Sequence, residues 1–258
     1  MEKIDIRNNP DYSSGIVVHK DFLYINGLQR CGTTSTREYL LDIYSKNLLE
    51  GELLQYVARY HMPIRFCTET ELKTKKILAN IRNPFSFYIS YVNYHISQKS
   101  GFINKEYGGF KDFKSILYDL LFKTNWSGFM SEFDGARYPK KDWKNNNKLN
   151  VGFYTKRYIN MFFKDGINIL NNWNTEEFFK YHDKKLTVTN IICMENLKSG
   201  IDTALKINDN IKIHQLNQSP FNGASKSLKY IIHKKYDKEM IDWVYEKDKI
   251  FFKKYYRS

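Results

Sequence analysis

One segment near the amino terminus, residues 22–35, constrains the fold of this chain more than any other. It begins with the apolar run from Phe22 to Ile25, typical of a buried strand, and passes through a loop with Gly27 and Gly32 into a helix. In such a turn the backbone N–H groups of the loop and of the first helical turn point toward one centre and hold an anion. The segment therefore predicts a strand, a loop and a helix arranged around an anion.

The loop differs from the one that binds nucleoside triphosphates. The spacing of Gly27 and Gly32 fits the first part of the pattern G-x-x-x-x-G-K-[ST], but Thr33 stands where that pattern has lysine. A triphosphate site without that lysine lacks the charge that reaches the β- and γ-phosphates. A cation does lie inside the loop, because Arg30 comes two residues before the second glycine. We therefore expect the loop to bind a different anion.

A second segment repeats this arrangement. Residues 76–81 predict a buried strand, and Pro84 fits the first turn of a helix over 84–97, where its missing N–H costs nothing. Arg82 would stand at the carboxyl end of that strand, and Ser90 about two helical turns further on. We expect both side chains to face a ligand lying across the strand ends.

Together the two segments resemble the donor-binding motifs of the sulfotransferases that use 3′-phosphoadenosine 5′-phosphosulfate (PAPS). The glycine loop resembles their 5′-phosphosulfate-binding loop, and Arg82-Asn83-Pro84 with Ser90 resembles their 3′-phosphate site. Many relatives carry an arginine where this chain has Phe87, so one electrostatic contact is lost here or replaced. The resemblance implies these donor-binding residues: Gly27, Gln29, Arg30, Cys31, Gly32, Thr33, Thr34, Ser35, Arg82 and Ser90.

The carboxyl-terminal half carries weaker signs of the same family. Residues 187–194 predict a strand, and Glu195-Asn196-Leu197, which begins a helix, resembles a late motif of the family. The tail resembles the terminal helix of carbohydrate-type sulfotransferases. The segment before it implies Ser225, Lys226 and Ser227 as further 3′-phosphate ligands, and the alternative is a polar loop on a basic surface.

The order of elements predicts an α/β fold, a P-loop-like parallel sheet flanked by helices in a single domain over 1–258. Residues 1–20 are expected to form an amino-terminal extension, and about 125–150 a loop near the acceptor site or a solvated insertion. The predicted strands are 21–26, 76–81 and 187–194, and the predicted helices are 33–44, 84–97, 110–124, 153–163 and 237–255.

Sulfuryl transfer to a hydroxyl needs a fixed cation near the sulfuryl oxygens and a general base. Arg30 fits the first role. We expect His61 to be the base, after an apparent helix over 52–60; the alternatives are a helix cap without a catalytic role, His95, or one of Glu52, Glu69 and Glu71. Cys31, at a helix start in an electropositive loop, is either a reactive thiol with a lowered pKa or a small side chain that lets the donor approach. No pattern of metal ligands is present, so no metal is implied.

The net charge of +13 favours an anionic partner without identifying it. No nucleic-acid-binding module and no apolar run of membrane-spanning length are present, so we expect neither a specific nucleic acid nor a membrane span, and a cytoplasmic location in a microbial or virus-infected cell. The predicted function is a PAPS-dependent sulfotransferase acting on a hydroxyl of a carbohydrate or another small molecule. The alternatives are an atypical P-loop kinase and a non-enzymatic basic protein that binds polyanions.

Overall fold

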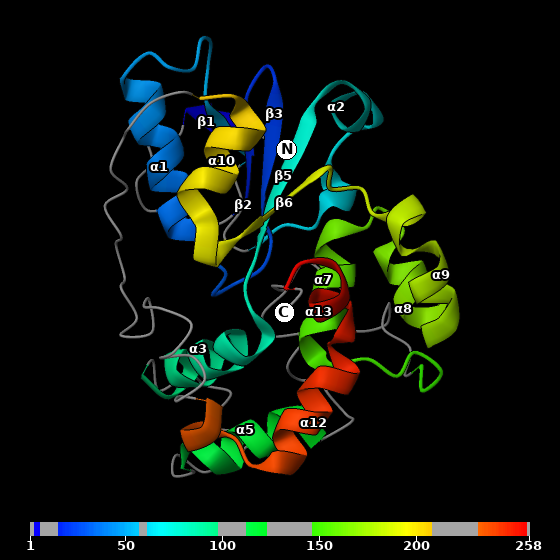
Figure 1. Cartoon of the computed structure of the whole chain (residues 1–258). Helices are drawn as coiled ribbons and strands as arrows, with labels where there is room; N and C mark the ends of the chain where they lie inside the picture. Colours follow the sequence, from blue (N-terminus) through cyan, green and yellow to red (C-terminus); the bar gives the residue numbers. More distant parts are fainter. Residues whose placement is uncertain are drawn as a thin grey trace.

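The computed structural model describes residues 3–5, 15–56, 61–97, 112–122, 146–207 and 232–256. In these residues a six-stranded sheet is flanked by helices, so the α/β class is confirmed (Figure 1). The strands are β1 (Lys3–Asp5), β2 (Gly15–Val18), β3 (Phe22–Asn26), β4 (Leu54–Tyr56), β5 (Lys76–Ile81) and β6 (Asn190–Cys193).

The sheet is mixed, so the prediction of a parallel sheet is correct only for one half. The strand order is β1-β4-β2-β3-β5-β6; β3, β5 and β6 pair in parallel, whereas β1, β4 and β2 join through antiparallel pairs. The predicted extension 1–20 supplies β1 and β2 to this second half. The predicted helix 52–60 is also wrong, because Leu54 pairs with Val18 in the sheet and forms part of β4.

The helices agree with the sequence prediction where local signals are strong. Strand β5 and helix α3 have the predicted bounds, and α1 ends one residue later than predicted. The predicted terminal helix is broken at Asp248 into α12 and α13, and α8 and α9 were not predicted. The α-helices are α1 (Thr33–Ser45), α2 (Glu69–Thr74), α3 (Pro84–Ser97), α5 (Phe113–Phe122), α7 (Phe153–Phe162), α8 (Gly166–Asn172), α9 (Thr175–Lys185), α10 (Leu197–Leu205), α12 (Lys238–Lys247) and α13 (Lys249–Lys254).

Apolar side chains cover both faces of the parallel half, which explains the unbroken apolar runs of its strands. Phe22 and Tyr24 of β3 pack with α1 and α10 on one face, and Leu23 and Ile25 pack on the opposite face in a second cluster that includes residues of α3 and α7. In Figure 1, α1 and α10 lie together beside the sheet. The glycine loop follows β3 and Arg82 follows β5, so each follows a strand that is packed on both faces.

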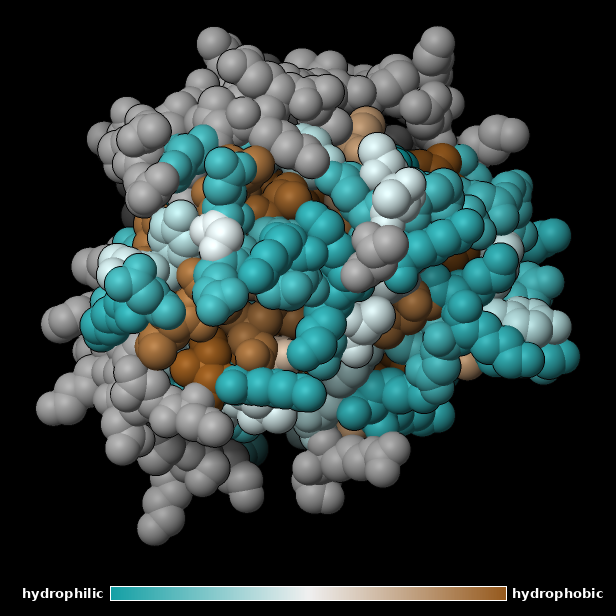
Figure 2. Space-filling model, turned by 90° about the horizontal axis from the view of Figure 1, so that it is seen from above, coloured by the Kyte–Doolittle hydropathy of each residue, from teal (hydrophilic) through white to brown (hydrophobic). Residues whose placement is uncertain are grey.

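Strands β3 and β5 present their two ends to different parts of the molecule. In Figure 1, α2 precedes β5 at the top of the drawing and α3 follows it below, so the amino ends of the parallel strands lie at the top. Figure 2 shows the molecule from that upper side, where hydrophilic residues make up most of the coloured surface and apolar residues show between them. The carboxyl ends of these strands point toward α3 in Figure 1.

Candidate anion-binding site

The glycine loop ends where α1 begins. Gly32 precedes the helix with φ 80° and ψ 22°, a left-handed conformation that glycine adopts at low cost, and a Cβ there would lie 3.1 Å from Cγ of Met194. Arg30 is also left-handed, with φ 67°. No side chain caps α1, and its first turn holds no acidic residue. The first N–H groups of a helix lack partners within the helix, so an anion placed before Thr33 and Thr34 could accept from them.

Three predicted donor-binding residues, far apart in the sequence, meet at the carboxyl ends of β3 and β5. Arg30 donates from Nε to Oγ of Ser90 at 3.2 Å, across 60 positions of sequence. Arg82 donates from Nη1 to the carbonyl oxygen of Arg30 at 3.1 Å, across 52 positions. The parallel pairing of β3 with β5 brings the two loops to the same edge of the sheet.

The two arginines form a concentrated positive charge. Arg82 is 5% exposed and Arg30 is half-buried, with its guanidinium 4.8 Å from the ring centre of Tyr94. Burial, and then the neighbouring charge of Arg82, lowers the pKa of Arg30. Among the residues that the structure describes, no carboxylate forms an ion pair with either arginine. An anion bound between them would relieve this repulsion.

Some of the remaining loop residues are partly exposed beside the turn, and others pack against the rest of the protein. Gln29, Thr34 and Ser35 are half-buried beside the turn, and Thr33 is 8% exposed. Gly27 has a packing role, because a Cβ there would lie 3.0 Å from Cβ of Met161 on α7. The loop thus rests closely on α7.

Cys31 is not a reactive thiol. Its side chain is fully buried, its Sγ lies 3.3 Å from the hydroxyl oxygen of Tyr154, and burial raises the pKa of the thiol to about 12. The lowered pKa expected from the electropositive loop is wrong, because desolvation outweighs the nearby arginines. Cys31 serves as a small buried residue of the loop.

His61 lies beside the residue that ends β3. Its Nδ1 is 2.9 Å from the carbonyl oxygen of Asn26, and burial lowers the pKa of the imidazole to about 4, with Arg157 contributing in the same direction. The ring is therefore neutral at pH 7. Since a carbonyl only accepts, Nδ1 carries the proton and donates it, which leaves the lone pair on Nε2. That nitrogen has the form that a general base requires.

The alternative bases make other contacts, are exposed, or have a side chain that the structure does not describe. Glu69 forms an ion pair with Lys164, and Glu71 caps α2 and accepts a hydrogen bond from Tyr56. Glu52 is exposed in the segment before β4. Of His95, the structure describes the backbone in α3 but not the side chain.

The sequence analysis missed a cation, Arg157, and undervalued an acid, Glu195. Arg157 is fully buried on α7, with its guanidinium 5.7 Å from the ring centre of Phe153. Glu195 follows β6; its Oε1 accepts from the backbone N–H of Asn83 at 3.0 Å and its Oε2 from the hydroxyl of Tyr256 at 2.8 Å. An arginine in a predicted helix rich in aromatic residues was the available signal for the first.

Phe87, where many sulfotransferases carry arginine, belongs to the core. Its side chain is fully buried, and its ring stacks on Tyr154 with the centroids 3.9 Å apart and 14° between the planes. An arginine in this position would not reach the anion site without disrupting that stack. The difference from the sulfotransferase pattern at this position therefore matches the local packing.

Some predicted features lie outside the described residues, among them Ser225, Lys226, Ser227 and most of the predicted loop at about 125–150. In the part of the chain that the structure does describe, no group of three or more His, Cys, Asp and Glu side chains is arranged to hold a metal ion. Within those same ranges, no helix combines the length and the apolar character needed to cross a membrane.

Comparisons with protein-family models, with curated proteins and with solved structures found no match.

Proposed function

We propose that this protein is a PAPS-dependent sulfotransferase that moves a sulfuryl group to the hydroxyl of a carbohydrate or another small molecule. One observation carries the proposal: Arg30, Arg82 and Ser90, predicted from two separate motifs, contact one another at the carboxyl ends of neighbouring parallel strands. Ligands of open α/β sheets bind at this edge. The net charge of +13 suits a donor with several negative charges.

The residues at this edge fit the two charged ends of the donor. The loop from Gly27 to Gly32 and the uncapped first turn of α1 would hold the 5′-phosphosulfate. Arg82, whose planar guanidinium suits bidentate binding of phosphate, and the hydroxyl of Ser90 would hold the 3′-phosphate. The donor supplies an activated sulfuryl group, and adenosine 3′,5′-bisphosphate is the product that remains.

Arg30 and His61 would divide the chemistry between them. The acceptor oxygen attacks sulfur as the bond to the leaving phosphate breaks, and negative charge grows on the bridging and equatorial oxygens. Arg30, fixed by its contact with Ser90, stabilises this charge. Nε2 of neutral His61 takes the proton of the acceptor hydroxyl. The low pKa of His61 rises when anionic groups bind nearby, which improves its match to this task.

Calorimetry with adenosine 3′,5′-bisphosphate tests the proposal directly, with ATP and Mg²⁺ as the competing ligand. We expect micromolar binding of the bisphosphate at physiological salt, weak binding of ATP, and bisphosphate binding weakened about 30-fold in Arg82→Met and also weakened in Ser90→Ala. Lys20→Met is the control, because it removes one positive charge from an exposed pair with Glu50.

The other functions predict different results in the same experiment. A kinase would prefer ATP with Mg²⁺. A basic polyanion binder would bind both ligands weakly, with similar losses in all variants and a steep dependence on salt. Selective bisphosphate binding would lead to a transfer assay with radiolabelled donor and a panel of sugar, phenol and peptide hydroxyls.

A further inference from the structure

Tyr154 of α7 links both anion-binding segments through one buried hydroxyl. The hydroxyl oxygen accepts from the backbone N–H of Arg82 at 2.8 Å, and the hydroxyl donates to the carbonyl oxygen of Arg82 at 3.1 Å. Sγ of Cys31 lies 3.3 Å from the same oxygen. Because a hydroxyl has a single hydrogen, which goes to the carbonyl, the thiol of Cys31 donates to the oxygen.

These contacts take the place of the sheet hydrogen bonds that Arg82 lacks just beyond the end of β5. The last paired residue of β5 is Ile81, opposite Cys193, so Arg82 has left the strand. Its N–H and C=O groups are buried with the residue, and a buried backbone group without a partner is destabilising. Tyr154 satisfies both groups and fixes the backbone from which the Arg82 side chain extends.

The ring of Tyr154 is held on both faces. Phe87 stacks on it with centroids 3.9 Å apart and 14° between the planes, and Phe251 of α13 stacks on it at 4.2 Å and 9°. The ring is fully buried, and burial raises the pKa of its hydroxyl well above 10, so the hydroxyl keeps its proton. The hydroxyl therefore has little freedom to move away from Arg82.

The backbone of Tyr154 is anchored as well. Its N–H donates to the hydroxyl oxygen of Tyr88 at 3.2 Å, and that hydroxyl donates to Oδ2 of Asp248 at 2.7 Å. Oδ1 of Asp248 accepts from the N–H and the hydroxyl of Thr155. This network joins the break between α12 and α13 to α7, and through Tyr154 to the anion site.

We propose that Tyr154 is a positioning residue that holds the glycine loop, through Cys31, and Arg82 in the mutual arrangement that anion binding requires. This proposal rests on the proposed function for the identity of the anion, but the contacts of Tyr154 with the protein do not depend on the donor. Loss of the hydroxyl would free the Arg82 backbone and the loop separately, while the stacked ring would keep its place.

The test uses two isosteric variants on the same helix, Tyr154→Phe and Tyr158→Phe. Tyr158 is also fully buried, and its hydroxyl lies 2.9 Å from Nε2 of His182 and 2.8 Å from the hydroxyl of Tyr255, neither of which belongs to the loop. Each variant removes one buried hydroxyl, so both should show a similar fall in the urea midpoint of unfolding. Only Tyr154→Phe should change the anion site.

Two measurements on the full chain distinguish positioning from general stability. Hydrogen exchange reports whether the Arg82 amide is still protected, and calorimetry reports binding of adenosine 3′,5′-bisphosphate and of inorganic pyrophosphate. We expect Tyr154→Phe to speed hydrogen exchange of the Arg82 amide and to lower the affinity for both anions about tenfold. Tyr158→Phe should leave both readouts at wild-type values after correction for global stability.

The outcomes separate this proposal from the proposed function. If the wild type binds pyrophosphate but not the bisphosphate, the PAPS assignment fails, and a selective loss of pyrophosphate binding in Tyr154→Phe still supports the role of Tyr154. Unchanged exchange of the Arg82 amide in Tyr154→Phe, equal losses of binding in both variants, or no binding of either anion by the wild type would overturn it.

Discussion

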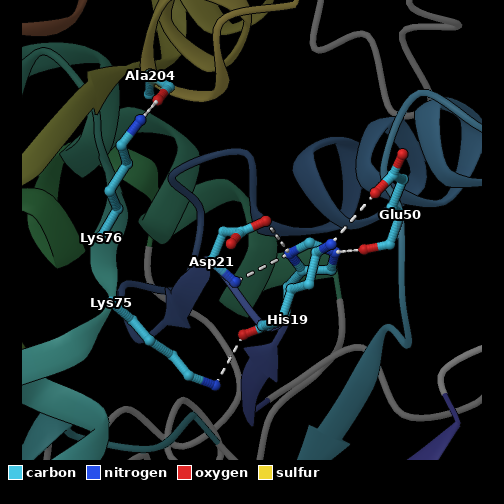
Figure 3. Close-up of polar contacts among 7 residues, drawn as sticks. His19, Asp21, Glu50, Lys75, Lys76 and Ala204 are labelled. Atoms are coloured by element: carbon cyan, nitrogen blue, oxygen red, sulfur yellow. Dashed lines mark hydrogen bonds and ion pairs between the residues drawn. The ribbon is translucent and has the colours of Figure 1, made fainter.

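The cations at the two ends of the parallel strands, called here the amino edge and the carboxyl edge, have different neighbours. At the amino edge, where β3 and β5 begin, Lys75 donates to the carbonyl oxygen of His19 at 2.7 Å and Lys76 to that of Ala204 at 2.9 Å (Figure 3). Lys20 pairs with Glu50 at 3.4 Å. At the carboxyl edge, Arg30 and Arg82 meet a hydroxyl, a carbonyl and an aromatic ring, and each other.

Each edge also holds a histidine, buried in the case of His19 and half-buried in the case of His61, and the comparison between them is equally informative. His19 is enclosed on both ring nitrogens: Nδ1 accepts from the N–H of Asp21 at 3.2 Å and Nε2 donates to the carbonyl of Glu50 at 2.9 Å, as Figure 3 shows. His61 uses Nδ1 in its contact with Asn26. A histidine bound on both sides supports structure, whereas one with a lone pair on Nε2 can accept a proton. Of the two histidines, His61 at the carboxyl edge is therefore the one that fits the proposed role of a base.

The largest expected difference between the edges concerns the two histidines. In His61→Asn the amide nitrogen takes the place of Nδ1 and keeps the contact with Asn26, but the base is lost. We expect sulfuryl transfer to fall about 100-fold or more, the usual contribution of a general base. His19→Gln, which keeps a donor in place of Nε2, should transfer at nearly the wild-type rate. Initial rates at saturating donor measure both, and equal rates in His61→Asn and His19→Gln would remove His61 from the mechanism.

The second difference concerns the arginine that follows β5. Arg82→Met should weaken binding of adenosine 3′,5′-bisphosphate about 30-fold, because charge-assisted hydrogen bonds to a phosphate in a buried site are strong. Lys76→Met, at the other end of the same strand, removes the same charge and should change the affinity less than about twofold. Calorimetry at several salt concentrations measures both. Similar losses in the two variants would mean that net charge, not this edge, attracts the anion.

A third prediction concerns the sign of a stability change. Arg30→Met should leave the free energy of unfolding unchanged or raise it by up to about 1 kcal/mol, because it ends the repulsion by Arg82. Lys75→Met should lower it by about 1 kcal/mol, because the hydrogen bond to His19 is lost. Urea denaturation without ligand measures both values. A larger loss in Arg30→Met than in Lys75→Met would show that Arg30 is a structural residue.

The sequence predicted the parts of this comparison that depend on local pattern. The bounds of β5 and α3 follow from a strand buried on both faces and from Pro84 at the helix start, and the spacing from Arg82 to Ser90 places both near the glycine loop. Strands β1 and β4 have three residues each, too few for a periodic signal, and their pairing joins distant segments.

Other parts depend on packing that no local pattern encodes. The break of the terminal helix follows from Asp248, which turns inward to accept hydrogen bonds from Tyr88 and Thr155. The role of Tyr154 arises only when α7 packs against the loop at Gly27. Candidate anion motifs can therefore be found in the sequence, whereas the residues that hold these segments in place are visible only in the fold.

The smallest expected effect sharpens the comparison of the histidines. NMR titration should give His61 a pKa of about 4, and burial lowers the pKa of His19 too. The pKa of unfolded histidine is about 6.5, so the contribution of His61 to stability is complete above that pH and is lost as the pH falls toward about 4. Adenosine 3′,5′-bisphosphate should raise the pKa of His61 by about half a unit and leave that of His19 unchanged, because an anion favours the protonated ring only where it is close. Equal shifts at both histidines would place the anion away from the carboxyl edge, whereas a shift at His61 alone puts negative charge beside Nε2, where the acceptor hydroxyl must lose its proton.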